Sequence, residues 1–329
     1  MDILITGQYV GMNIRTLLQR ELGYSANLIK KLKFTENGIT VNGVFKTVRY
    51  ELAEGDILSL AVEDTAKDVS PYTIPAELPI GILYEDEWLT VVDKPANMPA
   101  HPSLGHQLDT VSNALAWRYR EKPYVFRPVN RLDRDTSGCM LTANTRDASY
   151  KMYTSMTTGK VYKTYLAVLD NIPGQKSGTL MSYMHRKGDS IIEREETSSD
   201  MPDAKKAVTE YTVIAHRENT AVVLAHPITG RTHQIRVQFA GIGCPVVGDD
   251  LYWQPSEHIT RHALHCTATC FPHPETKEKI SVHAPVPEDI GTLLTELGYD
   301  VEEIEHICST YCEIYHEKMY NGKENDPNV

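Results

Sequence analysis

The sequence has no long apolar run. No stretch approaches the roughly eighteen apolar residues that a membrane-spanning helix requires, and the first residues lack the basic-then-apolar pattern of a signal peptide. With 41% hydrophobic and 23% charged residues, the composition is that of an ordinary globular protein. We therefore expect a cytoplasmic protein that does not enter a membrane.

Cysteine is scarce, and no pair has the tight C-x-x-C spacing of most zinc sites. The six cysteines stand at positions 139, 244, 266, 270, 308 and 312. Two pairs are four residues apart with a histidine nearby, but within a helix that spacing means only a shared face. We interpret all six as reduced thiols and regard a metal site as the less favoured alternative.

Positive charge is in deficit, with 33 basic against 44 acidic residues and a net charge of −11. Such acidity argues against a nucleic-acid partner until its distribution is considered. Residues 286–329 contain eleven acids and two lysines and carry −9, which leaves −2 for residues 1–285. The acidity lies mainly in a C-terminal extension at 291–329, where we predict one or two amphipathic helices on a solvated appendage.

The most informative segment is RLDRDTSG at residues 131–138. Asp133 follows an apolar residue and precedes Thr-Ser-Gly, the pattern of a strand end that enters a tight turn. Arginines at 131 and 134 favour the ionised form of a neighbouring carboxylate and are able to hold phosphates. On these residues alone, the simpler interpretation is a turn in which Asp133 or Asp135 caps backbone amides.

A second segment, TGRTHQIRV, occupies residues 229–237. Residues 231–240 are predicted to form a short helix with Ile235 on its apolar face, and Arg236 would lie near His233 on the same helix. A solvated basic helix is the alternative for this segment alone. Together, however, the two segments offer one aspartate and one arginine that is able to form a bidentate pair with it.

Both segments resemble the signatures of the RluA-type family of pseudouridine synthases, which read roughly H-R-L-D-x-x-T-S-G and G-R-T-H-Q-I-R. Further segments follow in the family's order over about residues 80–290: ILYED at 82–86, VVDKP at 91–95, KTYLAV at 163–168, CPVVGDDLY at 244–252 and RHALH at 261–265. Asn130 stands where the family usually has histidine. This departure leaves the aspartate and the arginine intact and affects local hydrogen bonding only.

The resemblance implies an α+β catalytic domain at residues 80–290, with a mixed, largely antiparallel sheet and a cleft across its middle. It implies an isomerase that converts specific uridines of structured ribosomal or transfer RNA to pseudouridine. No cofactor and no metal are expected, because the reaction has no redox step and no group donor. RNA is the expected partner, and we expect a monomer without a required protein partner.

The family's site residues carry over to matching positions of this chain. By resemblance, Asp133 is the catalytic aspartate, and Arg236 pairs with it and holds it charged. Tyr165 stacks on the uracil and accepts a proton late in the reaction. Arg131 fills the gap left when the target nucleotide leaves its stack. Further substrate contacts are expected from Leu132, Thr136, His233 and Ile235.

Two other functions stay open at this point. A catalytically silent RNA-binding or ribosome-assembly factor on the same fold has no need of Asp133, Tyr165 and Arg236 together. A hydrolase that releases a base or a sugar needs a second cooperating carboxylate, for which Asp135 is a candidate.

Residues 1–65 are interpreted as a separate unit. Helices are predicted at 12–21 and 25–34, the second capped by Ser25, and a hairpin with an Asn-Gly turn follows at 39–44. In the central domain, strands are predicted at 161–169, 207–215 and 220–226, helices at 111–119 and 146–156, and an exposed insertion near the cleft mouth at 186–206.

The predicted N-terminal helices are basic. Residues 11–34 contain a single acid and five basic residues: Arg15, Arg20, Lys30, Lys31 and Lys33. The unit resembles the small RNA-binding module of ribosomal small-subunit protein S-four, in which helices present basic residues to an RNA backbone. The alternative is an ordinary solvated helix face. Residues 66–79, with three prolines, are the predicted linker.

Overall fold

The computed structural model describes residues 1–24, 26–62, 68–190 and 192–324. The predicted cap Ser25 and the first two residues of the predicted linker lie outside these ranges. The N-terminal elements are β1 (Asp2–Leu4), η1 (Gly7–Tyr9), α1 (Ile14–Thr16), η2 (Leu17–Glu21), α2 (Ala26–Phe34), β2 (Ile39–Val41), β3 (Val44–Phe45) and β4 (Ile57–Leu60).

The N-terminal elements form a four-stranded sheet in the order β1-β4-β2-β3. Their own hydrophobic cluster includes Leu18, Leu28 and Ile39, each fully buried. The predicted Asn-Gly hairpin is confirmed: Asn42 and Gly43 have φ of 52° and 76°, the left-handed pair that a two-residue turn between β2 and β3 requires.

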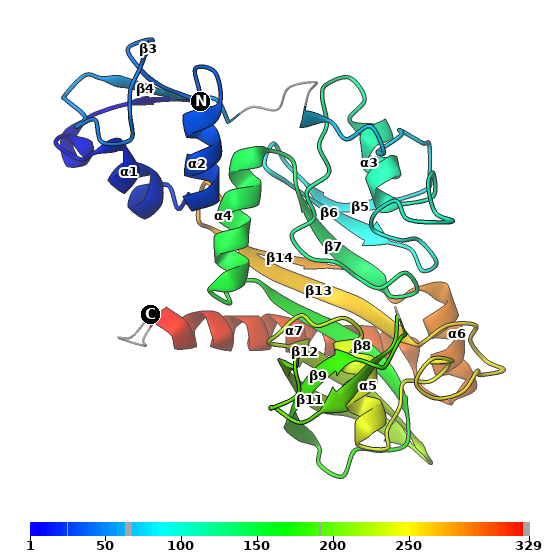
Figure 1. Cartoon of the computed structure of the whole chain (residues 1–329). Helices are drawn as coiled ribbons and strands as arrows, with labels where there is room; N and C mark the ends of the chain where they lie inside the picture. The colour runs from blue at the N-terminus through cyan, green and yellow to red at the C-terminus, as the bar shows by residue number, and fades with distance from the viewer. Residues whose placement is uncertain (25, 63–67, 191, 325–329) are drawn as a thin grey trace.

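The N-terminal unit packs against helix α4 (Arg146–Thr157), which lies between it and the main sheet (Figure 1). The rings of Tyr24 and Tyr150 are 6.5 Å apart, and Thr154 donates a hydrogen bond to the Gly23 carbonyl oxygen. The arginine that begins α4, Arg146, pairs with Asp68 at 2.6 Å. The two parts of the chain therefore share a packed interface.

The remaining elements build a ten-stranded sheet in the order β10-β9-β11-β12-β8-β13-β7-β6-β5, with β14 paired to β13. They are β5 (Gly81–Glu85), β6 (Leu89–Lys94), α3 (Val111–Arg118), β7 (Ser137–Ala143), α4, β8 (Tyr162–Asp170), β9 (Ser177–Arg186), β10 (Arg194–Thr197), β11 (Lys205–Arg217), β12 (Thr220–Pro227), α5 (Gln234–Gly241), β13 (Leu264–Pro272), β14 (Lys279–His283), α6 (Glu288–Glu296) and α7 (Val301–Glu324). All pairings are antiparallel except β13 with β7. The prediction of an α+β fold with a mixed, largely antiparallel sheet is confirmed.

Glycine at 138 is required where the parallel pair meets. Gly138 has φ of 102°, and a Cβ there would lie 2.3 Å from the Cys266 carbonyl oxygen. A side chain would thus be strained by the backbone conformation and would also collide with β13. The glycine of the Thr-Ser-Gly sequence therefore allows β7 to start directly after the loop that carries Asp133.

The C-terminal helices correct the prediction of a solvated appendage. Two amphipathic helices are present, as predicted, but α7 packs against β8, β11 and β13. Five of the buried side chains on α6 and α7 join the main core: Ile290, Leu293, Leu294, Ile304 and Cys308. Burial of each leucine or isoleucine contributes about 1.5–3 kcal/mol. Among the described side chains, acids such as Glu288, Glu302 and Glu303 are exposed, whereas the other side of these helices completes the domain.

No helix within the described residues is long and apolar enough to span a bilayer. All six cysteines are buried, and none of them forms a disulfide within the described residues. Cys266 and Cys270 lie on a strand, β13, whereas Cys308 and Cys312 lie on helix α7. In the part of the chain that the structure describes, no three His, Cys, Asp or Glu side chains are grouped to hold a metal ion.

Candidate active site

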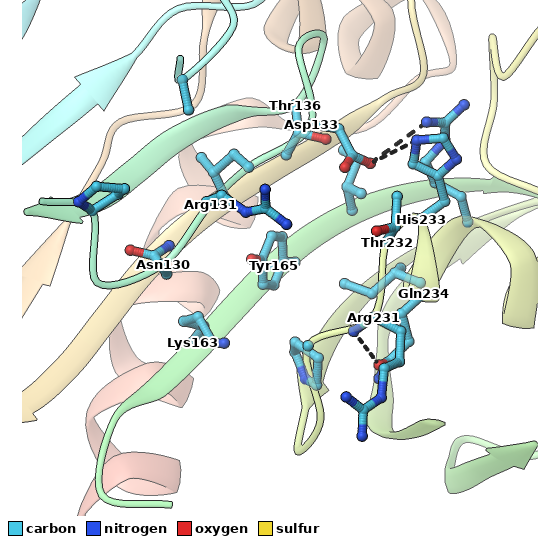
Figure 2. A pocket seen from close by; sticks show the side chains of 18 of the residues that line it. Asn130, Arg131, Asp133, Thr136, Lys163, Tyr165, Arg231, Thr232, His233 and Gln234 are labelled. Carbon is cyan, nitrogen blue, oxygen red and sulfur yellow. Dashed lines mark hydrogen bonds and ion pairs between the residues drawn. The ribbon is translucent and has the colours of Figure 1, made fainter. Parts of the chain in front are cut away.

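A cleft of about 590 Å³ crosses the middle of the large sheet (Figure 2). Its walls come from the loop before β7, from strand β8, and from the loop and first turns of α5. Among the described residues that line it, Asp133 is the one carboxylate, whereas five are cationic: Arg131, Arg134, Lys163, Arg231 and Arg236. The described lining of the cleft therefore has one acidic residue among several positively charged ones.

Asp133 lies in a turn that enters a strand. The predicted strand end is wrong, because residues 131–133 precede β7 as an irregular segment. The tight turn is confirmed, since the Thr136 N–H donates to the Asp133 carbonyl oxygen at 3.1 Å. The Asp133 side chain is 27% exposed, and the neighbouring Asp135 carboxylate pairs with Arg134 at 3.0 Å. Asp133 alone is thus presented to the cleft.

Buried polar side chains form hydrogen bonds to the backbone of this turn. Lys94 is fully buried and donates to three backbone carbonyl oxygens, of Pro95, Met98 and Arg134, at 2.7–2.9 Å. Arg261 donates to the Asp135 carbonyl oxygen at 2.9 Å. Burial lowers the pKa of Lys94 to about 7, against the opposing effect of the nearby acids. These bonds fix the backbone on which Asp133 stands.

Thr136 and Asn130 complete this support. The Thr136 hydroxyl is hydrogen-bonded to Nε2 of His262 at 2.8 Å, and both side chains are buried. Burial lowers the pKa of His262 well below its usual value, so the ring is neutral. The Asn130 Oδ1 accepts a 2.7 Å bond from the Leu141 N–H of β7. The residue that replaces the family's histidine therefore ties the loop to the sheet.

Helix α5 starts three residues later than predicted, at Gln234, because His233 has φ of 58°. The Gln234 Oε1 accepts bonds from the Arg231 N–H at 3.0 Å and the Thr229 hydroxyl at 2.7 Å. Its Nε2 donates to the Val208 carbonyl oxygen. These bonds close the loop into a tight bend and point His233 and Arg236 toward Asp133. Ile235 and Phe239 share the buried face, as predicted.

Arg236 forms the predicted ion pair with Asp133, but its bidentate pair is with Asp249, so the predicted bidentate geometry is corrected. Its Nε and Nη2 each lie 2.7 Å from an Asp249 oxygen, whereas its Nη1 lies 3.5 Å from Oδ2 of Asp133. Burial alone would lower the pKa of Arg236, but the hydrogen bonds and charge of Asp249 outweigh it and raise the pKa. Asp249 therefore orients a charged guanidinium whose free edge faces Asp133.

His233 approaches Asp133 (Figure 2), and Arg236 approaches the same oxygen. Its Nε2 lies 4.0 Å from Oδ2 of Asp133, and its Nδ1 is hydrogen-bonded to the Tyr252 hydroxyl at 2.7 Å. Burial lowers the pKa of His233 more than the Asp133 carboxylate raises it. The imidazole is therefore neutral at neutral pH.

Strand β8 supplies Tyr165 to the cleft. The side chain is 8% exposed, and burial, with Cys266 and Asp133 nearby, raises the pKa of its phenol well above the usual value. Tyr165 is therefore protonated throughout the ordinary pH range. Of the other expected contacts, Arg131 is exposed at the cleft, whereas Leu132 and Ile235 line its buried walls.

Several residues of this site were not predicted from the sequence: Lys94, Asp249, Tyr252, Arg261 and His262. Each lies in a segment that follows the family's order, but none stands in a pattern that indicates chemistry. The predicted insertion at 186–206 contributes strand β10, and the Arg194 N–H donates to the Tyr252 hydroxyl at 2.9 Å. This segment thus reaches the site through one backbone bond.

The five predicted basic residues of the N-terminal helices are all exposed. Lys31 is paired with Asp68 at 3.3 Å. Within the described residues, none of the five lines the cleft. They lie on the separate N-terminal unit, beyond helix α4 from the sheet (Figure 1).

Comparisons with known proteins identify the family. The RNA pseudouridylate synthase family model matches residues 89–241. YjbO of Bacillus subtilis strain 168, an uncharacterized RNA pseudouridine synthase, is 37% identical over 276 residues, which are 83% of this chain and 95% of the relative. The ribosomal large subunit pseudouridine synthase D of Vibrio cholerae is 33% identical over 289 residues, which are 81% of this chain and 85% of the relative.

A solved structure agrees with these matches. Human RNA pseudouridylate synthase domain containing 1 superposes with a TM-score of 0.53 and 26% identity over 63% of this chain and 83% of its own. A second human structure, domain containing 4, shares the fold with a TM-score of 0.55. The chain belongs to the RluA-type family of RNA pseudouridine synthases, isomerases that convert uridine in RNA to pseudouridine.

Proposed function

We propose that Asp133 is the catalytic carboxylate of this isomerisation and that the target uridine is flipped into the cleft beside it. The observation that carries the proposal is the position of Asp133: one half-exposed acid, 3.5 Å from the free edge of a buried guanidinium, in a cleft otherwise rich in cations. A cleft of about 590 Å³ is also of the size that accepts a small ligand group such as a nucleoside.

The chemistry needs one carboxylate. The bond between uracil N1 and ribose C1′ breaks with its electron pair left on N1, and the base turns within the cleft. A bond from uracil C5 to C1′ then forms, the C5 hydrogen leaves as a proton, and N1 takes up a proton. The Asp133 carboxylate either attacks C1′ or takes a proton from the sugar, and both routes need it ionised. Arg236, kept charged by Asp249, favours that state.

Tyr165 and Arg131 are assigned to holding the base and the RNA. Tyr165 offers an aromatic face on the cleft wall, which suits stacking on uracil. Because its pKa is raised, the phenol must first lose its own proton before it accepts one, and this favours stacking as its main role. Arg131, exposed at the cleft, suits the gap that a flipped nucleotide leaves in its stack.

The alternatives gain no support from the site. A silent binder would not need a buried Arg236–Asp249 pair aimed at a lone carboxylate. A hydrolase would need a second carboxylate in the cleft, but Asp135 is not among the described residues that line it and pairs with Arg134. The geometry supports isomerisation by one acid.

The proposal extends to the whole chain. Residues 1–65 act as an RNA-binding domain like that of ribosomal small-subunit protein S-four, 66–79 as a linker and 80–290 as the catalytic domain, with 291–329 as an extension. The substrate is ribosomal or transfer RNA, since related enzymes are named for the large ribosomal subunit. One chain supplies every residue of the site, which favours a monomer, and six cysteines without a disulfide favour the cytoplasm.

The RNA target is found by mapping pseudouridine in total RNA from cells with and without the gene. We expect one or more uridines to lose the modification when the gene is deleted, and to regain it when the wild-type gene is restored. Restoration with an Asp133→Asn gene should not return it. An unchanged pseudouridine map would contradict the proposal.

We predict that the exposed basic residues of the N-terminal helices supply affinity rather than rate. A variant with Arg15, Arg20, Lys30 and Lys33 all changed to Gln should bind RNA more weakly, because phosphate contacts release counterions. The slope of log affinity against log salt should fall by roughly one for each phosphate that is no longer neutralised. The saturated rate should stay within about twofold, since these residues lie outside the cleft.

Lys31→Gln provides the matched control. Lys31 already pairs with Asp68, so its loss should change the affinity less than the loss of the neighbouring Lys30. Equal affinity and an equal salt slope in the fourfold variant and the wild type would show that these residues are an ordinary solvated face.

A further inference from the structure

Tyr252 sits between the exposed β10 segment and the catalytic cleft. Its hydroxyl accepts a hydrogen bond from the Arg194 N–H at 2.9 Å and lies 2.7 Å from Nδ1 of His233. A backbone N–H is a donor only, so the hydroxyl is the acceptor in the first bond. Its own hydrogen is then available for the second bond, in which Nδ1 of His233 would be the acceptor.

This arrangement favours one tautomer of His233. A neutral imidazole carries one hydrogen, and with Nδ1 as the acceptor that hydrogen lies on Nε2. The ring is neutral because burial lowers its pKa, with Arg236 and Arg194 acting in the same direction and Asp133 and Asp249 in the opposite one. The Nε2–H is the end that faces Asp133, at 4.0 Å from Oδ2.

His233 and Arg236 make their nearest approach to the same oxygen of Asp133. The Arg236 Nη1 lies 3.5 Å from Oδ2 and the His233 Nε2 lies 4.0 Å from it. Two donors thus converge on one side of the carboxylate, as the dashed lines of Figure 2 show. A distance of 4.0 Å is too long for a hydrogen bond, but catalytic bonds commonly tighten once substrate fills the site.

The backbone of His233 adds a second observation. With φ of 58°, the residue holds a left-handed conformation that is uncommon for residues other than glycine. Backbone conformations of this kind cluster at functional sites, which suits a use for the imidazole. The half-buried side chain, 13% exposed, reaches Asp133 on one side and Tyr252 on the other.

We propose that His233, fixed by Tyr252 as the tautomer with its hydrogen on Nε2, is a positioning residue that holds Oδ2 of Asp133 and leaves Oδ1 for the uridine. This inference rests on the proposed function of Asp133, and it replaces a direct substrate-binding role for His233. Tyr252 acts indirectly, because it positions His233.

The tautomer is tested without activity. The full chain is labelled with ¹⁵N-histidine, and the His233 resonance is assigned by its loss in His233→Asn, a change that suits the left-handed backbone. We expect the hydrogen on Nε2 in the wild type. In Tyr252→Phe, which keeps the ring over Arg236 but removes the hydroxyl, we expect the Nε2–H preference to weaken.

Activity is then measured as tritium released to water under single-turnover conditions. The substrate is total RNA from cells that lack the gene, labelled with tritium at uracil C5. His233→Asn and Tyr252→Phe should lower the saturated rate about tenfold, the effect expected for one lost hydrogen bond. The enzyme concentration for half-maximal rate should change less than about twofold, since the RNA contacts are intact.

The two changes should not be additive. If Tyr252 acts through His233, the double variant falls no further than His233→Asn alone. The acidic limb of the rate profile should move to higher pH in Tyr252→Phe, because the neutral imidazole loses its donor and is protonated more readily. Tyr211→Phe is the control: it removes another partly buried hydroxyl bond, to the Gln175 carbonyl oxygen, and should leave rate and pH profile unchanged.

The contrary outcomes are distinct. A rise in the half-maximal concentration with an unchanged saturated rate would make His233 a substrate-binding residue and overturn the inference. Additive effects of the His233 and Tyr252 changes would also overturn the inference. So would a fully active wild type in which the His233 ring carries its hydrogen on Nδ1. A wild type that releases no tritium would overturn the proposed function, and this inference with it.

Discussion

Asp133→Asn is expected to abolish turnover. The amide keeps the shape of the carboxylate but can neither attack C1′ nor take a proton from the sugar, so the saturated rate should fall by at least about a hundredfold. Folding should be near normal, because the side chain is 27% exposed and Arg236 retains its bidentate partner Asp249. RNA binding should not weaken, since a negative charge is removed from a surface that meets phosphates.

Asp135→Asn is the matched control for this substitution. Asp135 stands two residues away, and it is not among the described residues that line the cleft; its carboxylate pairs with Arg134. We expect its rate to stay within about threefold of the wild type, as an exposed ion pair contributes little. Residual turnover above about 1% in Asp133→Asn, or equal losses at both positions, would assign the chemistry to another acid or to the pair.

Asp249→Asn is expected to lower both the stability of the protein and its catalytic rate. Arg236 and Asp249 are 5% and 1% exposed, and removal of the acid leaves a buried guanidinium without its counter-charge. Breaking a buried pair in this way costs about 3–5 kcal/mol, so the urea midpoint should fall clearly. The saturated rate should also fall, because Arg236 is no longer held beside Asp133.

Asp250→Asn offers the control at the next position. Asp250 is exposed, so its change should alter the free energy of unfolding by less than about 0.5 kcal/mol. If Asp249→Asn unfolds at the same urea concentration as Asp250→Asn, the Arg236–Asp249 pair does not hold the site together, and the account of how Arg236 is oriented is wrong.

The sequence predicted the large sheet well because its strands carry their own patterns. β8, β11 and β12 are runs of β-branched and aromatic residues, and they appear within a few residues of the predicted bounds. The start of α5 was missed because a histidine in the left-handed region ends the preceding loop. No sequence rule indicates that conformation, which depends on the bonds of Gln234 to β11.

The residues at the centre of the candidate site were predicted from the sequence, but the residues that orient them were not. Asp133 and Arg236 were recognised from two segments, and the structure brings them within 3.5 Å. The bidentate partner of Arg236 could not be read from spacing, because Asp249 reaches it through a loop whose path is set by tertiary packing. The amphipathic pattern of the tail likewise showed a buried face, but not that this face covers the main sheet.

The most direct test of the central claim is the fate of the C5 hydrogen. Purified full-length protein is incubated with tritium-labelled total RNA from cells that lack the gene, and both tritiated water and free uracil are measured. We expect tritium release with no free uracil from the wild type, and no release by Asp133→Asn. Free uracil would show hydrolysis, and absence of tritium release from RNA that the wild-type protein binds would show a silent binder; either result would contradict this claim.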